Sequence, residues 1–331
     1  MGGYLPNVDY YYFSDCVLRQ TPEYYEDAHG NKIIGKYEGL KFCFSGFGSV
    51  IEIGDNVRFR DTCIYINNDS KIVIGDDGQF VESRIFIHHS SKVVFGSEVH
   101  LTKTEITMGD EAGLEMKYGC GIAWMSMNIG KGAEVILNDN SNVHSAGVLE
   151  SSEGLTDWRL GENAKLEIGK RGNFYGGGML WLYKNAVFRA GDEFRINRQY
   201  RFVLSIDTSI LIGNDCLFSF SISMWSNDCH SIFDIAARKN INSLQHIRRE
   251  RKIIIGNHVW VGDCAEILYD TEIGNGSIIG AMSLVKSRIP NNCIAAGVPA
   301  RIIRKNVAWC GQDGAEEILE CGQEYIHDTN E

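Results

Sequence analysis

One short motif recurs along most of the chain and limits the folds open to it. The segments "SVIEIGDNVRF", "SKVVFGSEVHL", "TEITMGDEAGL", "AKLEIGKRGNF" and "DTEIGNGSIIG" each place an apolar residue before a glycine, then polar residues and another apolar position. The motif's glycines stand at 54, 75, 96, 109 and 130, and later at 256 and 274. A period of about 18 to 22 residues made of six-residue pieces predicts a parallel β-helix, and excludes a sandwich or a doubly wound sheet.

The apolar residue before each glycine is predicted to point inward and to stack on its equivalents in the coils above and below. These positions include Ile53, Ile74, Ile168, Ile212, Ile255 and Ile273. We expect the glycine and the Asn or Asp after it to relieve crowding at corners where φ is positive. Because one coil buries little by itself, stability should come from stacking, with caps at the ends.

Composition and charge exclude several classes of protein. Hydrophobic residues make up 44% of the 331 residues, and the net charge of -11 argues against broad nucleic-acid binding or a basic membrane patch. No apolar run approaches the roughly 20 residues that span a bilayer. The start, "MGGYLPNVDYYYFSD", lacks the basic flank and apolar core of a signal peptide. With ten cysteines and no CxxC pair, we expect a cytoplasmic protein with reduced thiols.

The chain divides into three parts on this pattern. Residues 1–38 carry no repeat and are predicted to form an aromatic cap. Residues 39–305 form the β-helix, interrupted by a loop at 226–252. Residues 306–331 form an acidic tail, in which "GAEEILECG" is a candidate short helix.

From about residue 40 to 305 the chain resembles a known family, most strongly after residue 226. "NDCHSIFD", "IN" at 241–242, "IIIGNHVWVGDCAEIL" and "AAGVPARIIRK" follow one another in order. This succession is similar to the hexapeptide-repeat acyltransferases, in particular the polysaccharide O-acetyltransferases of capsule and lipopolysaccharide loci. The resemblance implies a left-handed parallel β-helix, an all-β fold with a protruding active-site loop, and assembly as a homotrimer. It also implies acetyl transfer from acetyl-coenzyme A to a sugar hydroxyl.

The loop at 226–252 is the longest break in the repeat and contains His230. An alcohol is a weak nucleophile until a base takes its proton, and histidine, with an unperturbed pKa near about 6.5, suits that task. The resemblance implies the same role for His230. We expect Asp228 to orient the imidazole as in a catalytic triad. Alternatively, His230 is a structural loop histidine, and Asp228 pairs with Arg248, Arg249 or Arg251.

The resemblance implies that residues after the loop hold the donor. Trp260 occupies an outward strand position suited to walling the thioester end of a coenzyme or to stacking against a sugar ring. His258 should share its strand face without a catalytic role. Small residues would admit the pantetheine arm, and cations would meet the phosphates. The proposed donor residues are Trp260, Gly262, Gly280, Ala281, Ser283, Lys286, Arg301, Arg304 and Lys305. The alternatives are a subunit contact for the tryptophan and a solvated basic edge for the cations.

Other functions on the same scaffold fit less well. A γ-type carbonic anhydrase would need three zinc-binding histidines, and the nine histidines contain no pair five apart, so we expect no metal site. A non-catalytic carbohydrate-binding or assembly module would not need His230. A nucleotidyltransferase would need a catalytic domain ahead of the repeat. An acetyl-coenzyme A-dependent acyltransferase acting on a carbohydrate is the expected function.

Overall fold

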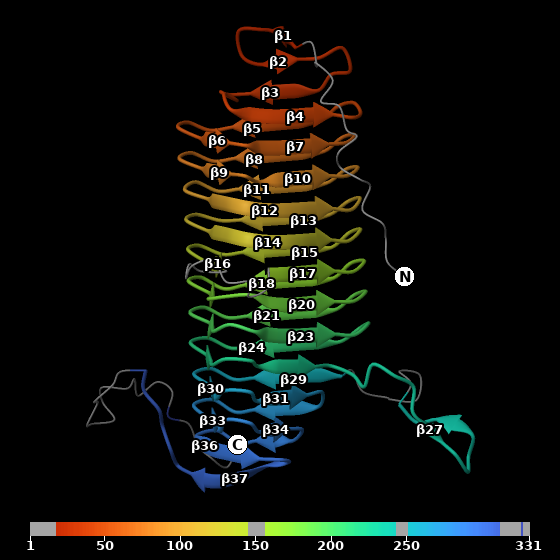
Figure 1. The fold of residues 1–331 in the computed structure, drawn as a ribbon, viewed down its shortest axis with the longest axis vertical. Helices are drawn as coiled ribbons and strands as arrows, with labels where there is room; N and C mark the ends of the chain where they lie inside the picture. Colours follow the sequence, from red (N-terminus) through yellow and green to blue (C-terminus); the bar gives the residue numbers. More distant parts are fainter. Residues whose placement is uncertain (1–17, 145–155, 243–250, 312–325, 327–331) are drawn as a thin grey trace.

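The repeat folds into a tall stack of coils, shown in Figure 1. The computed structural model describes residues 18–144, 156–242, 251–311 and 326. Within these ranges every regular element is a β-strand, and no helix is long and apolar enough to cross a membrane. The predicted all-β parallel solenoid is confirmed. The candidate helix at "GAEEILECG" lies outside the described residues.

Each coil contributes strands to three parallel columns. The first column holds β3 (Lys32–Ile34), β5 (Val50–Ile53), β8 (Lys71–Ile74), β11 (Lys92–Phe95), β13 (Gly113–Met116), β15 (Glu134–Leu137), β18 (Lys165–Ile168), β21 (Val187–Ala190), β24 (Ser209–Ile212), β29 (Lys252–Ile255), β32 (Thr271–Ile273) and β35 (Arg288–Ile289). The second holds β6 (Arg58–Arg60), β9 (Gln79–Val81), β16 (Asn142–His144), β19 (Asn173–Phe174), β22 (Arg195–Ile196), β25 (Leu217–Phe218), β30 (Trp260–Val261), β33 (Ile278–Ile279) and β36 (Cys293–Gly297). The third holds β4 (Leu40–Phe44), β7 (Thr62–Ile66), β10 (Arg84–Ile87), β17 (Thr156–Leu160), β20 (Gly178–Leu182), β23 (Tyr200–Leu204), β26 (Ser223–Trp225), β31 (Glu266–Leu268) and β34 (Leu284–Val285).

A few strands depart from this plan. β12 (His100–Met108) and β14 (Gly121–Ile129) run through the corner between the second and third columns, pairing with strands of both. At the amino-terminal end, β1 (Arg19–Gln20) and β2 (Tyr25–Glu26) add to β3 as antiparallel strands. β3 pairs in parallel with β5, so it is the first strand of the first column. At the other end, β37 (Ala300–Lys305) turns back antiparallel along β36.

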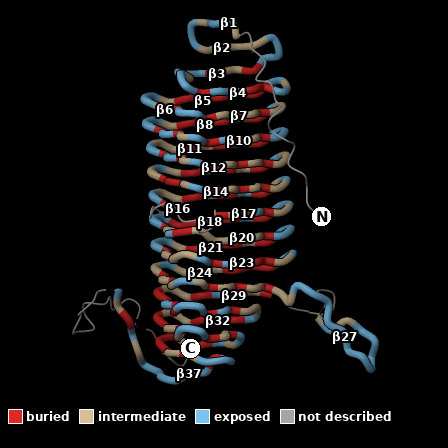
Figure 2. Tube along the Cα trace, viewed as in Figure 1, coloured by how far each residue is buried: buried red, intermediate tan, exposed pale blue. Residues whose placement is uncertain are grey.

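The core lies inside the stack, as the buried bands of Figure 2 show. All six isoleucines that precede the motif glycines are buried, from 7% exposed at Ile53 to 0% at Ile168. Ile53 pairs with Ile74 and Ile255 with Ile273, which reproduces the change of period from 21 to 18 residues along the chain. The predicted inward ladder is confirmed.

The motif glycine is needed for close approach between coils, and positive φ occurs elsewhere. A Cβ on Gly169 would lie 2.3 Å from the carbonyl carbon of Gly191 in the next coil. Positive φ falls two residues later, for example at Arg171 with φ 55°. The expectation that the glycine itself serves a positive φ is therefore wrong at this corner, because backbone contact between coils sets the requirement.

The repeated motif occurs at two different corners of the coil, although its sequence is similar at both. Gly96 follows β11 of the first column, whereas Gly109 follows β12 at the end of its third-column part. Both glycines face backbone of the next coil, so the same steric need produces the same local sequence.

Asn and Asp side chains connect successive coils at the first-to-second corner. Side-chain oxygens there accept hydrogen bonds of 2.7–2.9 Å from backbone N–H groups one coil away. The acceptors are Asp192, Asn214, Asn257, Asn275 and Asn291. These bonds satisfy backbone donors that the turn leaves without a strand partner.

Candidate functional site

The break in the repeat leaves the solenoid between β26 and β29, at the edge where the third column passes to the first. Residues 226–242 and 251–252 of this loop are described, so Arg248 and Arg249 lie outside the described residues. The loop carries a small antiparallel hairpin of β27 (Phe233–Asp234) and β28 (Lys239–Asn240). Figure 1 shows it projecting away from the stack.

His230 lies on this loop with its side chain exposed. Its backbone N–H donates to the carbonyl of Asp228 at 2.7 Å, and Cys229 between them has a φ of 59°. The His230 carbonyl accepts a 2.8 Å hydrogen bond from the amide of Asn242. Within the described part of the chain, no group is hydrogen-bonded to the imidazole. The backbone is therefore tightly held while the ring faces outward.

Asp228 does not orient the imidazole directly. One carboxylate oxygen accepts a 2.7 Å hydrogen bond from the phenol of Tyr269, and the other accepts one of 3.0 Å from Asn242. The second oxygen also lies 3.5 Å from Nη1 of Arg251, whose side chain is 3% exposed. The expected triad-like contact is absent among the described residues, and the pairing with Arg251 is the alternative that holds. Asp228 instead fastens the loop to the solenoid.

The surroundings of Asp228 keep its carboxyl group ionised. Partial burial by itself would raise the pKa of Asp228. The hydrogen bonds from Asn242 and Tyr269, together with the charges of Arg251 and Lys286, outweigh burial and lower this pKa below its usual value. A fixed negative charge therefore sits at the base of the loop.

Lys286 belongs to the same cluster. Its amine lies 3.0 Å from the Tyr269 hydroxyl and 4.1 Å from the centre of the Tyr269 ring. The guanidinium of Arg251 lies over the same ring at 4.2 Å. The structure therefore places Lys286 with the loop base, apart from the three cations of β37 with which the sequence grouped it.

The remaining donor residues gather on the second column and its following corner. Trp260 is 39% exposed on β30, between Leu217 of β25 and Ile278 of β33. Gly262 and Gly280 follow β30 and β33 on neighbouring coils, and the backbone N–H of Gly262 donates to the carbonyl of Ile279 at 2.8 Å. A Cβ on Gly262 would lie 2.8 Å from the backbone nitrogen of Ala281, so coil packing alone also requires this glycine.

Two further donor candidates differ in their exposure. Ala281 is exposed at the corner. Ser283 is 1% exposed, and its hydroxyl accepts a 3.1 Å hydrogen bond from the backbone N–H of Gly297. The Ser283 hydroxyl therefore holds the carboxy-terminal turn.

The basic edge is formed by β37. Arg301, Arg304 and Lys305 are all exposed. They pair with Ala296, Ile294 and Cys293 of β36, which continues the second column below Trp260. These three cations therefore lie at the same end of the same column as the tryptophan.

His258 does not share a strand face with Trp260. It occupies a corner with a φ of 54° and is 5% exposed. Its Nδ1 lies 2.8 Å from Asp215, and its Nε2 lies 2.9 Å from the carbonyl of Trp309, whose ring stacks on it at 4.1 Å. The strand-face expectation is wrong because β30 begins only at Trp260, so His258 still belongs to the corner that follows β29. Trp309, which the sequence did not single out, anchors the carboxy-terminal segment there.

The predicted site residues thus lie at two different edges of the solenoid. His230, Asp228 and Lys286 lie at the third-to-first edge. Trp260 and the glycines lie on the second column and at the second-to-third edge. Figure 1 shows the loop hairpin and strands β30, β33 and β36 on opposite sides of the stack.

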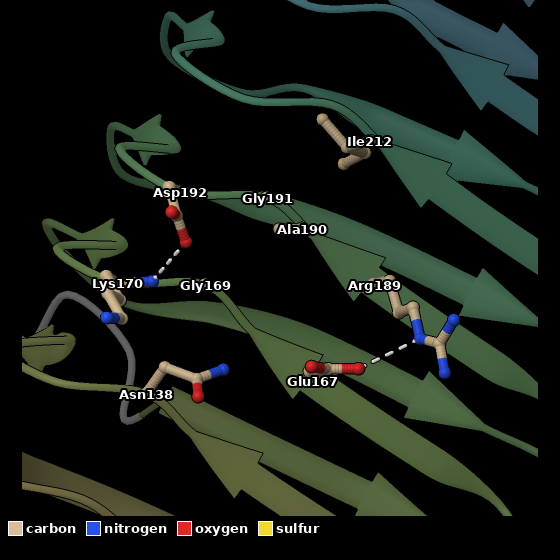
Figure 3. Close-up of a pocket in the computed structure, with 9 residues that line it drawn as sticks. All are labelled: Asn138, Glu167, Gly169, Lys170, Arg189, Ala190, Gly191, Asp192 and Ile212. Carbon is tan, nitrogen blue, oxygen red and sulfur yellow. Dashed lines mark hydrogen bonds and ion pairs between the residues drawn. The ribbon is translucent and has the colours of Figure 1, made fainter.

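A separate shallow groove of about 430 Å³ lies higher on the stack (Figure 3). Arg189 pairs there with Glu167 at 2.9 Å, Asp192 accepts a 2.7 Å hydrogen bond from the Lys170 backbone N–H, and the Lys170 amine lies 3.7 Å from Asp139. None of the predicted site residues lines it. In the described ranges, no three His, Cys, Asp or Glu side chains lie close enough together to hold a metal ion.

Comparison with known proteins finds one family model and several curated relatives that each match part of the chain. Residues 252–287 match the family described as bacterial transferase hexapeptide (six repeats). A putative lipopolysaccharide biosynthesis O-acetyl transferase, WbbJ of Escherichia coli (strain K12), is 32% identical over 149 residues, covering 44% of this chain and 70% of the relative. The polysialic acid O-acetyltransferase of Escherichia coli O1:K1 / APEC is 38% identical over 118 residues, which is 36% of each chain.

Two further similarities are weaker or shorter. The galactoside O-acetyltransferase of Escherichia coli (strain K12) is 34% identical over 129 residues, 38% of this chain and 60% of the relative. The chain thus spans less than two thirds of this relative and of the polysialic acid enzyme. The crystal structure of the polySia specific acetyltransferase NeuO has 23% identity and a TM-score of 0.45, over 86% of this chain and 94% of that chain.

Proposed function

The chain belongs to the hexapeptide-repeat acyltransferases with left-handed β-helices, in their polysaccharide O-acetyltransferase subgroup, and from this membership we propose that it moves an acetyl group from acetyl-coenzyme A to a sugar hydroxyl of a bacterial surface polysaccharide or its precursor. The observation that carries the proposal is His230, an exposed imidazole on a firmly fastened loop at the break in the repeat. A ring held in this way is open to an incoming sugar.

His230 acts as the general base. Its imidazole takes the proton of the sugar hydroxyl as the oxygen attacks the thioester carbonyl carbon. The new C–O bond forms, the C–S bond breaks, and the proton passes from the imidazolium to the departing coenzyme A thiolate. The products are the acetyl ester and coenzyme A, and the histidine returns to its starting state.

We expect direct transfer, without an acetyl-cysteine intermediate. Cys229 is the nearest thiol in sequence to His230. Desolvation by burial, together with the negative charge of Asp228, raises the pKa of Cys229, which keeps this group as the poorly nucleophilic thiol. A covalent route through Cys229 would need the opposite shift.

The donor lies along the second column. Trp260 walls the thioester end, Gly262, Gly280 and Ala281 admit the pantetheine arm, and the basic edge of β37 meets the phosphates. Ser283 contributes by holding the corner at Gly297. Because Lys286 lies at the loop base, it would reach the phosphates of a donor held by a neighbouring subunit.

The two-edge arrangement supports a homotrimer. A base and a donor site on opposite sides of one solenoid cannot act on the same bond within one chain. A cyclic assembly of three chains places the loop of one subunit beside the second column of the next, at three equivalent interfaces. Exposed apolar residues on the loop hairpin, including Phe233 at 61% and Ile235 at 92% exposed, suit burial against such a neighbour.

The test is thiol release from acetyl-coenzyme A across a panel of acceptors. The relatives act on polysialic acid and galactosides by their names, so the panel contains polysialic acid, 4-nitrophenyl β-galactoside and purified capsular and lipopolysaccharide glycans. We expect one polysaccharide acceptor to raise thiol release in the wild type but not in His230→Ala. Equal release by the two proteins would overturn the assignment of the base.

A further inference from the structure

The loop that carries His230 is organised around one amide. The Oδ1 atom of Asn242 accepts a 2.8 Å hydrogen bond from the backbone N–H of Ile232. Its Nδ2 group donates to the His230 carbonyl at 2.8 Å and to the Asp228 carboxylate at 3.0 Å. The three partners are alternate residues, with His230 in the middle. One side chain therefore fixes the backbone on both sides of the proposed base.

Asn242 is itself held in place. Its backbone N–H donates to the side chain of Asn240 at 2.9 Å, and its carbonyl accepts a 3.3 Å hydrogen bond from Nη2 of Arg251. Arg251 is almost fully buried where the chain re-enters the first column. The amide is thus connected to the solenoid through the guanidinium and through Asp228.

We propose that Asn242 is the positioning residue of the reaction. It sets the place of the His230 imidazole through the backbone, because the described residues offer the ring itself no hydrogen bond and both Asp228 oxygens are occupied elsewhere. The inference rests on the proposed function, in which His230 is the base. It assigns to Asn242 the orienting task that the sequence had given to Asp228.

The chemistry explains why an amide is required at this position. Asparagine offers two donors and one acceptor in a plane, which match a carbonyl, a carboxylate and an N–H. An aspartate in its place would keep the acceptor but lose both donors. It would also bring a second negative charge to within about 3 Å of Asp228, where like charges repel strongly.

The test is a double-mutant cycle on the intact protein. Asn242→Ala should lower kcat by about 10²-fold, the effect expected when a catalytic group is misplaced by about 1 Å. KM for acetyl-coenzyme A should change less than about two-fold, because the donor is bound on the other edge. The rise of kcat/KM with pH should persist in Asn242→Ala and vanish in His230→Ala, since the base is still present in the first variant.

The decisive variant is His230→Ala/Asn242→Ala. If Asn242 acts only through His230, the double variant should be no slower than His230→Ala alone. Additive losses would overturn the positioning role, as would wild-type kcat in Asn242→Ala while His230→Ala is inactive. Wild-type activity in His230→Ala would instead contradict the proposed function. Failure of the positioning role and failure of the proposed function therefore give different results.

A control variant and a second readout complete the design. Glu167→Ala removes a 2.9 Å ion pair with Arg189 between exposed side chains of the first column, away from residues 228–232, and it should leave kcat within about two-fold of wild type, as surface changes usually do. The slow hydrolysis of acetyl-coenzyme A in the absence of a sugar also releases thiol and gives a second readout, because the same base can deprotonate the attacking water. Asn242→Ala should slow this release too, and an unchanged rate would contradict the proposal.

Discussion

The phenol of Tyr269 donates a 2.7 Å hydrogen bond to the carboxylate of Asp228, which lies 41 residues earlier in the chain. Asp228 begins the protruding loop, and Tyr269 follows β31 of the next coil. The contact therefore fastens the loop to a part of the solenoid that forms only when the coils stack. Because Arg251 and Lys286 lie over the same tyrosine ring, one residue gathers the charges at the loop base.

Tyr269→Phe should loosen the loop without disturbing the solenoid. The substitution keeps the ring beneath Arg251 but removes the hydrogen bond to a partly exposed carboxylate, which is worth about 1–2 kcal/mol. Local opening should then be about ten-fold more populated, and limited proteolysis of the loop correspondingly faster. Tyr183→Phe is the matched control, since Tyr183 is 51% exposed and its hydroxyl has no hydrogen-bond partner in the described ranges. Equal cleavage of both variants would contradict the role of Tyr269.

Asp228 should make stability depend on pH in the acid range. Since its pKa is lowered in the folded protein, the ionised carboxyl stabilises the fold above the unfolded value of about 3.9. That stabilisation is lost as pH falls through the folded-state pKa. The difference in unfolding free energy between wild type and Asp228→Asn should therefore be largest at neutral pH and shrink below about pH 4, as measured by urea unfolding. A difference that stays constant down to about pH 2 would rule out the linkage.

The fold could be predicted because its determinants are local. Each apolar residue before a glycine specifies an inward position and a close approach in the same short segment, so Ile53 and Ile273 could be placed without knowledge of their neighbours. The same locality explains the error over Gly109. Its corner and that of Gly96 face the same steric demand, and nothing nearby in the sequence separates them.

The candidate site could be predicted only in part because its contacts are long-range. His230 was recognisable from the break in the repeat and from its resemblance to a family motif. The partners of Asp228 were not, since Asn242, Arg251 and Tyr269 follow it by 14, 23 and 41 residues and meet it only through coil stacking. The "IN" pair at 241–242 was a signal for Asn242, but sequence alone could not give the amide its partners.

Gly169→Ala should destabilise the solenoid. Its new methyl group would meet backbone atoms of Gly191 and Asp192 at 2.3–2.5 Å, and backbone cannot move aside without displacing a coil. We expect a loss of about 1–3 kcal/mol in unfolding free energy, typical of overpacking. Gly311→Ala is the control, because a Cβ added there would meet no atom of the described residues within 4 Å, its chain neighbours apart, and the φ of Gly311 is not in the left-handed region. Equal stability of the two variants in urea unfolding would argue against tight contact between coils.

Coenzyme A should stabilise the protein through the basic edge. Ligand that binds only the folded state adds about 2.7 kcal/mol at 100 times Kd, so the melting temperature should rise with concentration. Arg301→Ala/Arg304→Ala should shrink this rise markedly, and Lys286→Ala should shrink it less, because Lys286 is already engaged by Tyr269. If coenzyme A raises the melting temperature of the double variant as much as that of wild type, β37 does not bind the phosphates.

The division of the site between two edges predicts complementation between inactive subunits. His230→Ala and Trp260→Ala should each be strongly impaired, since one lacks the base and the other the wall of the donor site. If each site takes His230 from one chain and Trp260 from its neighbour, mixed trimers contain some intact sites. Random mixing in equal amounts leaves about a quarter of the sites with both residues, so co-expression should restore about a quarter of wild-type activity. Each variant co-expressed with a differently tagged copy of itself provides the control. If mixed trimers form, as shown by purification through both tags, and remain as inactive as the parents, the base and the donor wall belong to one chain. Light scattering that reports a monomer would exclude the shared site altogether.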